Sequence, residues 1–267
     1  MAQTSSVGAA AETVDWLGRP VCCGDCPHEV IRAQGHCDLG RICVRDRRAR
    51  RIDRFFAANP GEAENYLAHP YFEARAMAAK HASVFLLPPL LNDVEPDVRA
   101  MAAHRLPVNR IAGLRRDPDR KVRMVVAQRL QGAALIPLLG DADYAVRLAT
   151  VKRVASDVLP IAMSDPDPQV RREVARRIKA DVLPVMAIDP DPLVRIVVAE
   201  RLEPVQLTAL IADVDLRVRY VVAERGNALA LARLCNDPDP EVRRRARARR
   251  TIRADKTSAE SDDGPWA

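Results

Sequence analysis

The residues whose side chains are best suited to chemistry are cysteines near the start of the chain. Five of the six lie within one short stretch, as Cys22, Cys23, Cys26, Cys37 and Cys43. Cys23 and Cys26 have the Cys-x₂-Cys spacing, in which one turn presents two thiolates to the same centre. Cys37 and Cys43 follow at a looser spacing. Four thiolates in so short a span can bind either a zinc ion or a four-iron cluster.

Spacing alone does not decide between these centres. Structural zinc usually uses two Cys-x₂₋₄-Cys pairs, and the pair Cys37 and Cys43 is wider than that. Cluster sulfurs lie farther apart and tolerate looser spacing, although this order is not a standard ferredoxin run. Reduced cysteines without any ligand are a third interpretation. His28 and His36 lie among the cysteines, and we expect them to face the ligands from outside or to face solvent.

The segment around the cysteines cannot fold by hydrophobic burial alone. Residues 16–54 combine dense cysteine with four glycines and few large apolar residues, so we expect a metal centre to hold this module together. The arginine-rich stretch 41–54 either balances the negative charge of a four-thiolate centre or is a solvated helix face. Residues 1–15 are small and polar, and we expect them to be disordered.

A strict internal repeat follows and must position this module. The phrase Asp165-Pro166-Asp167-Pro168-Gln169-Val170-Arg171 returns 24 residues later as Asp189-Pro190-Asp191-Pro192-Leu193-Val194-Arg195. A fixed period of this size indicates a stacked array in which each unit packs on its neighbours. We expect full units over 93–253, preceded over 55–92 by a helical coupling segment and a degenerate first repeat. The arginine of the phrase recurs without insertion at Arg75, Arg99, Arg123, Arg147, Arg171, Arg195, Arg219 and Arg243.

Each full unit opens with signals for a helix. We expect the first aspartate, such as Asp165, to cap the helix N-terminus, with the next proline in its first turn. The second aspartate, Asp167, lies four residues before Arg171, and we expect these two side chains to pair on the helix surface. Val170 and Val174 then lie on the apolar face of a helix of about 12 residues.

About ten residues per unit remain for the return. In one unit Leu183, Met186 and Ala187 lie at i, i+3 and i+4, and Pro184 falls in the first turn, where proline is tolerated. A short 3₁₀ piece fits this length as well as an α-helix does. Strict alternation is absent, so we predict no strand and an all-α fold. Cys235 takes a position that leucine or isoleucine holds in other units, so we expect it in the core.

A second arginine series lies six residues after the first, in the last turn of each helix. Its members are Arg105, Arg129, Arg153, Arg177, Arg201 and Arg225. One interpretation is a basic ladder for phosphates. The other is pairing with the acids of the next unit, as of Arg177 with Asp189 or Asp191. We favour this pairing, because repeated acids largely cancel the ladder's charge and no aromatic residues interleave for base stacking.

The C-terminal end of the array differs from its middle. The last unit loses its apolar face to arginines, which gives a capping repeat a polar outer surface. We expect residues 254–267 to form a disordered tail. The arginines concerned are Arg243, Arg244, Arg245, Arg247, Arg249, Arg250 and Arg253.

The phrase and its period resemble the leucine-rich repeat variant family, closely over 93–250 and more loosely over 69–92. Helical repeats with a similar start run longer, at about 40 residues. The resemblance implies a right-handed solenoid that alternates α and 3₁₀ helices. The cysteines, with Pro27-His28-Glu29, Asp38-Leu39-Gly40, Asp46-Arg47 and Arg51-Ile52-Asp53-Arg54-Phe55-Phe56, also resemble that family's N-terminal iron–sulfur module. This implies a [4Fe–4S] cluster bound by Cys23, Cys26, Cys37 and Cys43, with Cys22 as an alternative to Cys23.

The sequence carries no signature of catalysis. It has no Gly-rich phosphate loop, no nucleophile–base pair and no helix with metal-binding histidine spacing, so we do not expect an enzyme. It also lacks a secretory signal and a long apolar run, which predicts a cytoplasmic location and no membrane contact.

We therefore expect a monomeric, non-enzymatic interaction protein with an unidentified protein partner. Its cluster would serve redox or oxygen sensing, or electron transfer to that partner. A zinc-stapled scaffold is a weaker alternative. The main alternative is a nucleic-acid-binding protein that uses the arginine ladder and the basic C-terminal cap. The formal net charge of +6 permits nucleic-acid binding but does not demand it.

Overall fold

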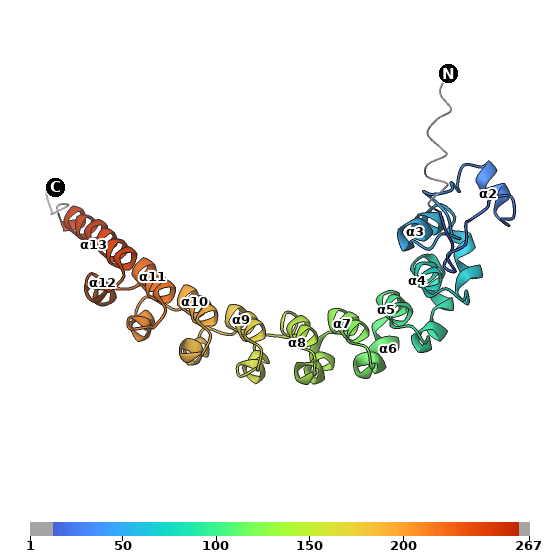
Figure 1. The fold of residues 1–267 in the computed structure, drawn as a ribbon. Coiled ribbons are helices and arrows are strands. Elements are labelled where there is room, and N and C mark those ends of the chain that lie inside the picture. The colour runs from blue at the N-terminus through green and yellow to red at the C-terminus, as the bar shows by residue number, and fades with distance from the viewer. Residues whose placement is uncertain (1–12, 262–267) are drawn as a thin grey trace, which may run out of the picture. The chain divides into compact units, whose positions relative to one another are not determined.

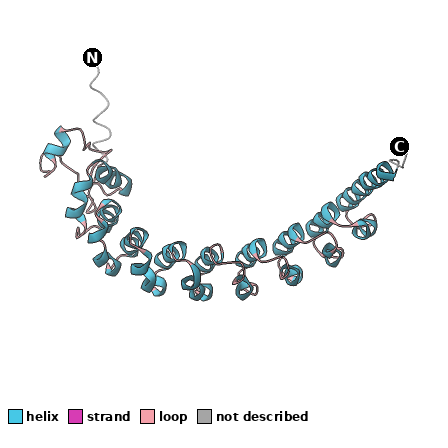
Figure 2. Cartoon of the chain, turned by 180° about the vertical axis from the view of Figure 1, so that it is seen from behind, coloured by secondary structure: helices cyan, strands magenta, loops and turns pink. Residues whose placement is uncertain are grey.

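The computed structural model describes residues 13–261, and the regular elements within that range are all helical (Figure 2). Two isolated bridges, Val14 with Pro20 and Asp38 with Ile42, are the β-type contacts of the described residues, and neither lies in a repeat. The predicted all-α fold is therefore confirmed. The chain divides after Ala134 into two compact units. Across residues 13–261, no helix combines the length and the apolar character needed to cross a bilayer.

Unit 1 carries the cysteine module and the first repeats (Figure 1). On α3 the side chains of Ile52, Phe55 and Phe56 are fully buried, as their helical spacing predicted. They belong to one hydrophobic core that extends from Val44 to Ile111, so the module and the first repeats are packed together. The elements of unit 1 are α2 (Glu29–Ala33), α3 (Ala49–Ala58), η1 (Pro60–Tyr66), α4 (Phe72–His81), η2 (Val84–Leu86), η3 (Pro88–Asn92), α5 (Pro96–Arg105), α6 (Val108–Ile111), η4 (Ala112–Arg116) and α7 (Arg120–Arg129), where η denotes a 3₁₀ helix.

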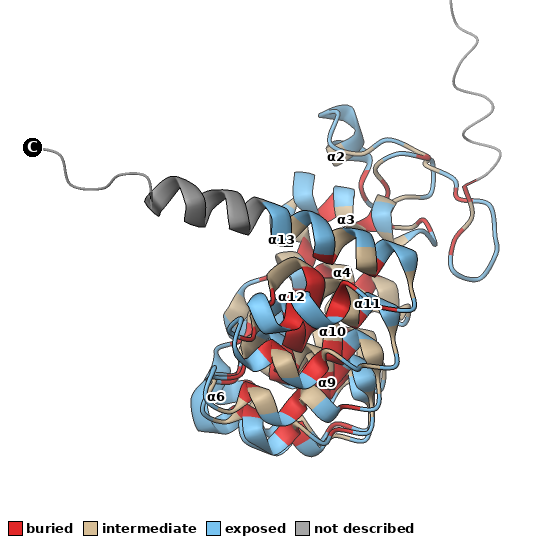
Figure 3. Ribbon diagram, turned by 90° about the vertical axis from the view of Figure 1, so that its left-hand side faces the viewer, coloured by how far each residue is buried: buried red, intermediate tan, exposed pale blue. Residues whose placement is uncertain are grey.

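Unit 2 repeats one α-helix and one return segment. Helices α8 to α11 lie side by side in one layer and the return segments form a second layer (Figure 1). The buried residues of α9 to α12 line the interior between these layers (Figure 3). The elements of unit 2 are α8 (Tyr144–Val151), η6 (Leu159–Ala162), α9 (Pro168–Arg177), η7 (Leu183–Ile188), α10 (Pro192–Arg201), η8 (Gln206–Leu210), α11 (Leu216–Arg225), α12 (Ala228–Leu234) and α13 (Pro240–Ser261), and η5 (Gly132–Gly140) contains the division between the units.

Three predicted boundaries differ from the structure. Helix α3 crosses the predicted limit at residue 54. Thr13 and Asp15 are buried parts of the module, although we expected disorder through residue 15. Helix α13 runs to Ser261, past the start of the predicted tail at 254. Its arginines and alanines are strong helix formers, so the helix continues beyond its packing neighbours α11 and α12. The rest of both predicted terminal segments, 1–12 and 262–267, lies outside the described residues.

The repeat helices start two residues later than we expected. In α9 the N-cap is Asp167, whose Oδ1 accepts a hydrogen bond from the backbone N–H of Gln169 at 2.7 Å, and Pro168 is the first helical residue. The Oδ1 of Asp165 instead accepts from the N–H of Asp167 at 2.8 Å. The prediction that the first aspartate caps the helix was therefore wrong. Its carboxylate is already bound by Arg147 of the preceding unit.

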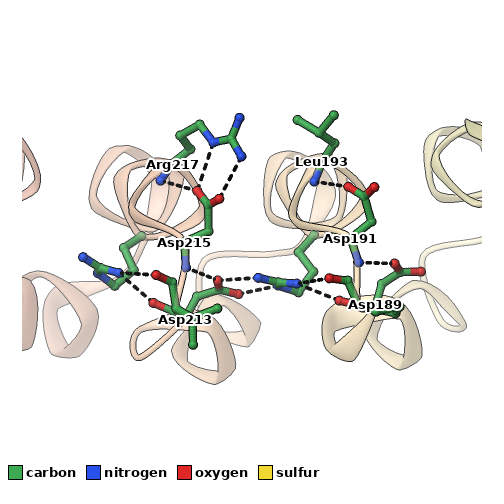
Figure 4. Close-up of polar contacts among 10 residues, drawn as sticks. Asp189, Asp191, Leu193, Asp213, Asp215 and Arg217 are labelled. Carbon is green, nitrogen blue, oxygen red and sulfur yellow. Dashed lines mark hydrogen bonds and ion pairs between the residues drawn. The ribbon is translucent and has the colours of Figure 1, made fainter. Parts of the chain in front are cut away.

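The recurring arginine joins neighbouring units rather than pairing within its own helix. Arg171 donates from Nε to Oδ2 of Asp189 at 2.7 Å and from Nη2 to Oδ1 at 3.0 Å, and both residues are more than nine-tenths buried. Its Nη1 donates to the carbonyl oxygen of Asp165 at 2.8 Å. The predicted pair of Asp167 with Arg171 was therefore wrong. Figure 4 shows the arrangement at Asp189 and Asp213, and the same fork joins Arg75 to Asp93, Arg99 to Asp117, Arg147 to Asp165, Arg195 to Asp213 and Arg219 to Asp237.

Candidate metal centre

Tight turns bring the four candidate cysteines to one end of unit 1. Cys23 and Cys26 lie on a turn closed by a 3.3 Å hydrogen bond from the N–H of Cys26 to the carbonyl of Cys23. Helix α2 follows, and the chain turns back through Gly35, whose φ of +78° suits glycine. Cys37 and Cys43 then flank a hairpin-like turn in which Gly40 has φ +81°. This turn returns the chain so that the two cysteines lie close together.

Cys37 and Cys43 form the more enclosed half of the site. Cys43 is buried, and the Sγ of Cys37 donates to the carbonyl of Ile42 at 3.3 Å. The hydrogen bond between the two thiols and burial raise the pKa of Cys37. The same hydrogen bond lowers the pKa of Cys43 to about 7 against the effect of burial, with help from the backbone N–H groups of Arg45 and Asp46. Amide N–H groups aimed at a sulfur favour its thiolate form, which is the form that binds metal.

Cys23 and Cys26 complete the group from the outer side. Burial raises the pKa of Cys23, Arg32 opposes that rise, and the nearby sulfurs of Cys43, Cys26 and Cys22 add to it. Cys37 interacts in the same way with Cys43, Cys26 and Cys23. The four sulfurs therefore interact electrostatically with one another. Cys22 also acts on Cys23, but it differs from these four in being exposed to solvent.

The two candidate centres require different arrangements of the sulfurs. Among the described residues, no three His, Cys, Asp or Glu side chains converge closely enough to hold a single metal ion. Structural zinc needs four ligands within about 2.3 Å of one ion. In a four-iron cluster each thiolate binds a different iron, so the sulfurs stand farther apart.

Neither histidine of the module has the position of a ligand. His28 is buried, and its Nε2 lies 2.6 Å from the hydroxyl of Tyr66, with its ring centre 5.0 Å from that of Phe55. Burial lowers the pKa of His28, which favours the neutral ring. His36 is exposed. We missed Tyr66 from the sequence, because it lies 38 residues from His28 and no local pattern links the two.

The charged residues after Cys43 mainly order the loop. Arg51 donates to Asp46 at 2.6 Å, and Asp46 is almost wholly buried. Arg45 reaches across to the carbonyl oxygens of Cys22 and Asp25, at 3.4 and 3.3 Å. The remaining arginines of 47–54 are exposed, as expected for a solvated helix face. Arg45 is thus the cation of this stretch that touches the cysteine turn.

Beside the cysteines, an open hollow of about 770 Å³ lies between the module and η1. Its lining includes Pro27, Val44, Arg45, Glu62 and Tyr66.

The second arginine series does not form a free basic ladder. Arg177 donates from Nη2 to the carbonyl of Val154 at 2.9 Å, and Arg201 donates to that of Ile178 at 2.8 Å. Each therefore binds carbonyl groups at the C-terminal end of the preceding helix, which lack partners within that helix. The predicted partners of Arg177, Asp189 or Asp191 in the next unit, were wrong. These arginines do join neighbouring repeats, as we favoured, but they do so through backbone carbonyls of the preceding repeat.

Cys235 is buried at the end of α12, which confirms its predicted place in the core.

Comparison with known proteins agrees with both parts of the chain. Residues 13–65 match the family model described as "LRV protein FeS4 cluster". A curated relative, the "Uncharacterized 27.7 kDa protein in nifB 3'region" of Rhodobacter capsulatus, is 51% identical over 87 residues. That alignment covers 33% of this chain and 36% of the relative, so the chain spans only about a third of that protein.

A solved structure matches far more of the chain. It is titled "A leucine-rich repeat variant with a novel repetitive protein structural motif" and superposes with a TM-score of 0.81 at 40% sequence identity. The match covers 86% of this chain and 98% of that one. From the matched cluster family it follows that the cofactor of the N-terminal module is a four-iron, [4Fe–4S] cluster.

Proposed function

The chain belongs to the leucine-rich repeat variant family, and we propose that it is a non-enzymatic redox protein of the cytoplasm. Its cluster senses redox state or oxygen, or passes electrons, and its helical repeats bind a protein partner of the monomer. The observation that carries this proposal is the gathering of four cysteines on a module whose core is continuous with the first repeats. A structural change at the cysteines can therefore be transmitted through this core to the helices that a partner would contact.

We assign Cys23, Cys26, Cys37 and Cys43 as the cluster ligands. The support is their mutual proximity, the burial of Cys43 and the solvent exposure of Cys22. When bound, the cluster supplies one-electron transfer. The chain's own residues exclude water on the inner side through Cys43 and Val44, and they supply positive charge through Arg45.

Matched cysteine variants test the ligand assignment. The protein should be purified anaerobically and its iron, sulfide and absorbance near 400 nm measured. Cys43→Ser should lose most of the cluster, whereas Cys22→Ser, the control, should keep it. The repeats should keep most of their far-ultraviolet circular dichroism, because each unit stacks on its neighbours. Equal loss in both variants, or loss in Cys22→Ser alone, would refute the assignment.

A redox titration tests the function apart from the ligands. A redox protein should show reversible one-electron reduction, followed by electron paramagnetic resonance, within the range of about −700 to +450 mV known for such clusters. A cluster that is present but cannot be reduced or oxidised reversibly would leave only a structural role, and the redox proposal would fail.

The second arginine series does not support the alternative function, nucleic-acid binding. Arg129, Arg177 and Arg201 each donate to a backbone carbonyl of the preceding repeat, so their guanidinium groups are already engaged. Any binding of nucleic acid must therefore depend on another surface.

A further inference from the structure

Positive charge gathers at two places in this chain, the stretch 41–54 and the start of α13. Residues 240–253 contain seven arginines and one acid, Glu241, which gives +6. The whole chain has 42 basic and 36 acidic residues, also +6, so the other residues hold 35 of each and sum to zero. A capping helix needs only a polar surface, which mixed charges provide. Like charges three and four residues apart destabilise a helix, so this concentration calls for a further explanation.

Contacts divide these arginines into two sets. One set holds α13 to unit 2: Arg243 donates to the carbonyl of Pro238 at 2.8 Å, Arg245 pairs with Glu224 at 3.1 Å, and Arg249 reaches the carbonyl of Gly226. The members of the other set, Arg244, Arg247 and Arg250, are exposed, and within α13 Arg244 also pairs with Glu241. Their spacing of three residues places them within an arc of about 120° on the helix. The outer side of α13 thus presents a stripe of three guanidinium groups.

A hollow beside this stripe adds further hydrogen-bonding groups. It measures about 420 Å³ and is lined by Cys235, Asn236, Arg247, Arg250 and Thr251. The Nε of Arg247 donates to the carbonyl of Cys235 at 3.2 Å, which anchors the side chain beside the hollow. Guanidinium groups bind phosphate oxygens with two parallel hydrogen bonds, and arginine suits this task better than lysine.

The apolar residues of α13 narrow the choice of partner. Val242 and Ala246 are buried within unit 2, and no large apolar side chain is exposed over 240–251. A membrane-lying helix needs an exposed apolar face, and a protein interface has an apolar centre, so both fit this stripe poorly. The same stretch has no aromatic residue on which unpaired bases could stack. Contact with a phosphate backbone needs none of these features.

We propose that the stripe of Arg244, Arg247 and Arg250 binds the phosphate backbone of duplex nucleic acid, without reading its sequence. This function is separate from that of the cluster, and it replaces the ladder as the basic surface of the chain. Binding of this kind weakens with salt, with a slope of log K against log salt of about −0.9 for each phosphate contact on DNA.

The test is fluorescence anisotropy of a labelled mixed-sequence DNA duplex with the cluster-loaded full chain, over a fourfold range of salt. Replacing the three arginines by glutamine (R244Q, R247Q and R250Q together) should reduce the salt slope by up to about 2.7. The native chain's loss of affinity over that range should then exceed the variant's by up to about 40-fold. Lysine at the same three positions should retain most of the slope, because the charge remains.

The matched control removes the same charge elsewhere in unit 2, with R176Q, R217Q and R233Q together. All three side chains are exposed, so this control should keep the native slope. The proposal fails if both glutamine variants lose equal affinity, since net charge alone would then explain binding. It also fails if the native chain does not bind at the lowest salt, or if polyglutamate or phosphatidylserine vesicles compete as well as the duplex. Circular dichroism of each variant confirms that α13 is still folded.

Discussion

Replacing Asp189 by asparagine should destabilise unit 2 far more than removing an exposed ion pair does. The carboxylate accepts two hydrogen bonds from Arg171, at 2.7 and 3.0 Å, and one from the N–H of Asp191 at 2.8 Å. The carbonyl oxygen of asparagine can take the place of Oδ1, which accepts from Asp191 and from Nη2 of Arg171. Its NH₂ group cannot accept from Nε of Arg171, so the buried guanidinium loses that bond and faces a neutral partner.

The magnitude follows from burial. Breaking a buried ion pair by removing one partner costs about 3–5 kcal/mol, whereas exposed pairs contribute about 0–1 kcal/mol. The side chains of Arg171 and Asp189 retain 11% and 5% of their exposure, so we expect a loss near the lower limit, about 3 kcal/mol. Arg176→Gln removes the exposed pair with Glu173 from the same helix and should cost less than about 1 kcal/mol.

Urea denaturation followed by far-ultraviolet circular dichroism measures both changes. Because a repeat array need not unfold in one step, amide hydrogen exchange of α9 and α10 should be measured beside it. The double variant with Arg171→Met gives the coupling energy, since the buried charge is then removed with its partner. If Asp189→Asn costs no more than Arg176→Gln, the fork does not hold neighbouring units together and our account of the repeat is wrong.

Three further changes test other contacts. Burial opposes ionisation of Asp117, but the hydrogen bonds from Arg99 and the backbone outweigh it and hold the pKa below its usual value. The stability that this group contributes should thus be present above about pH 5 and lost progressively below pH 4 in urea titrations, and a pH-independent midpoint would contradict this. Gly226→Ala should destabilise the chain by about 1–3 kcal/mol in urea denaturation, because its Cβ would lie 2.6 Å from the backbone oxygen of Val222. Gly113→Ala, which has open space around its Cβ, is the control and should be neutral or slightly stabilising in the same measurement. Arg201→Gln should cost about 1–3 kcal/mol in urea, since buried carbonyl oxygens of the preceding helix lose their donor; an unchanged midpoint would show that water replaces it.

The repeat itself was predictable because its signals are local. The apolar spacing of Val170 and Val174 and the proline at position 184 depend only on nearby residues, and the structure has the predicted helix and 3₁₀ segment there. The helix start was misplaced because both aspartates of the phrase look alike in sequence. Only the stacked structure shows that Asp165 is held by an arginine 18 residues earlier.

The metal centre was predictable in kind but less so in detail. Cysteine spacing left zinc and a cluster open, and the family resemblance favoured the cluster. The sequence could not show which residues surround the metal centre. The contact of His28 with Tyr66 and the reach of Arg45 to the turn of Cys22 depend on packing between segments that no local pattern joins.

The contacts between neighbouring repeats also explain why the 24-residue period never varies. At each junction described within unit 2, one arginine reaches forward, as Arg171 does to Asp189, and another reaches back, as Arg201 does to Ile178. An inserted residue in the return segment would displace the aspartate from a fork that spans 18 positions, and the buried guanidinium would lose its partner. The return segments within unit 2 are therefore constrained in length by the forks that they join. Function is then left to the cysteine module, to the exposed faces of the helices and to the terminal helix, where the strict pattern ends.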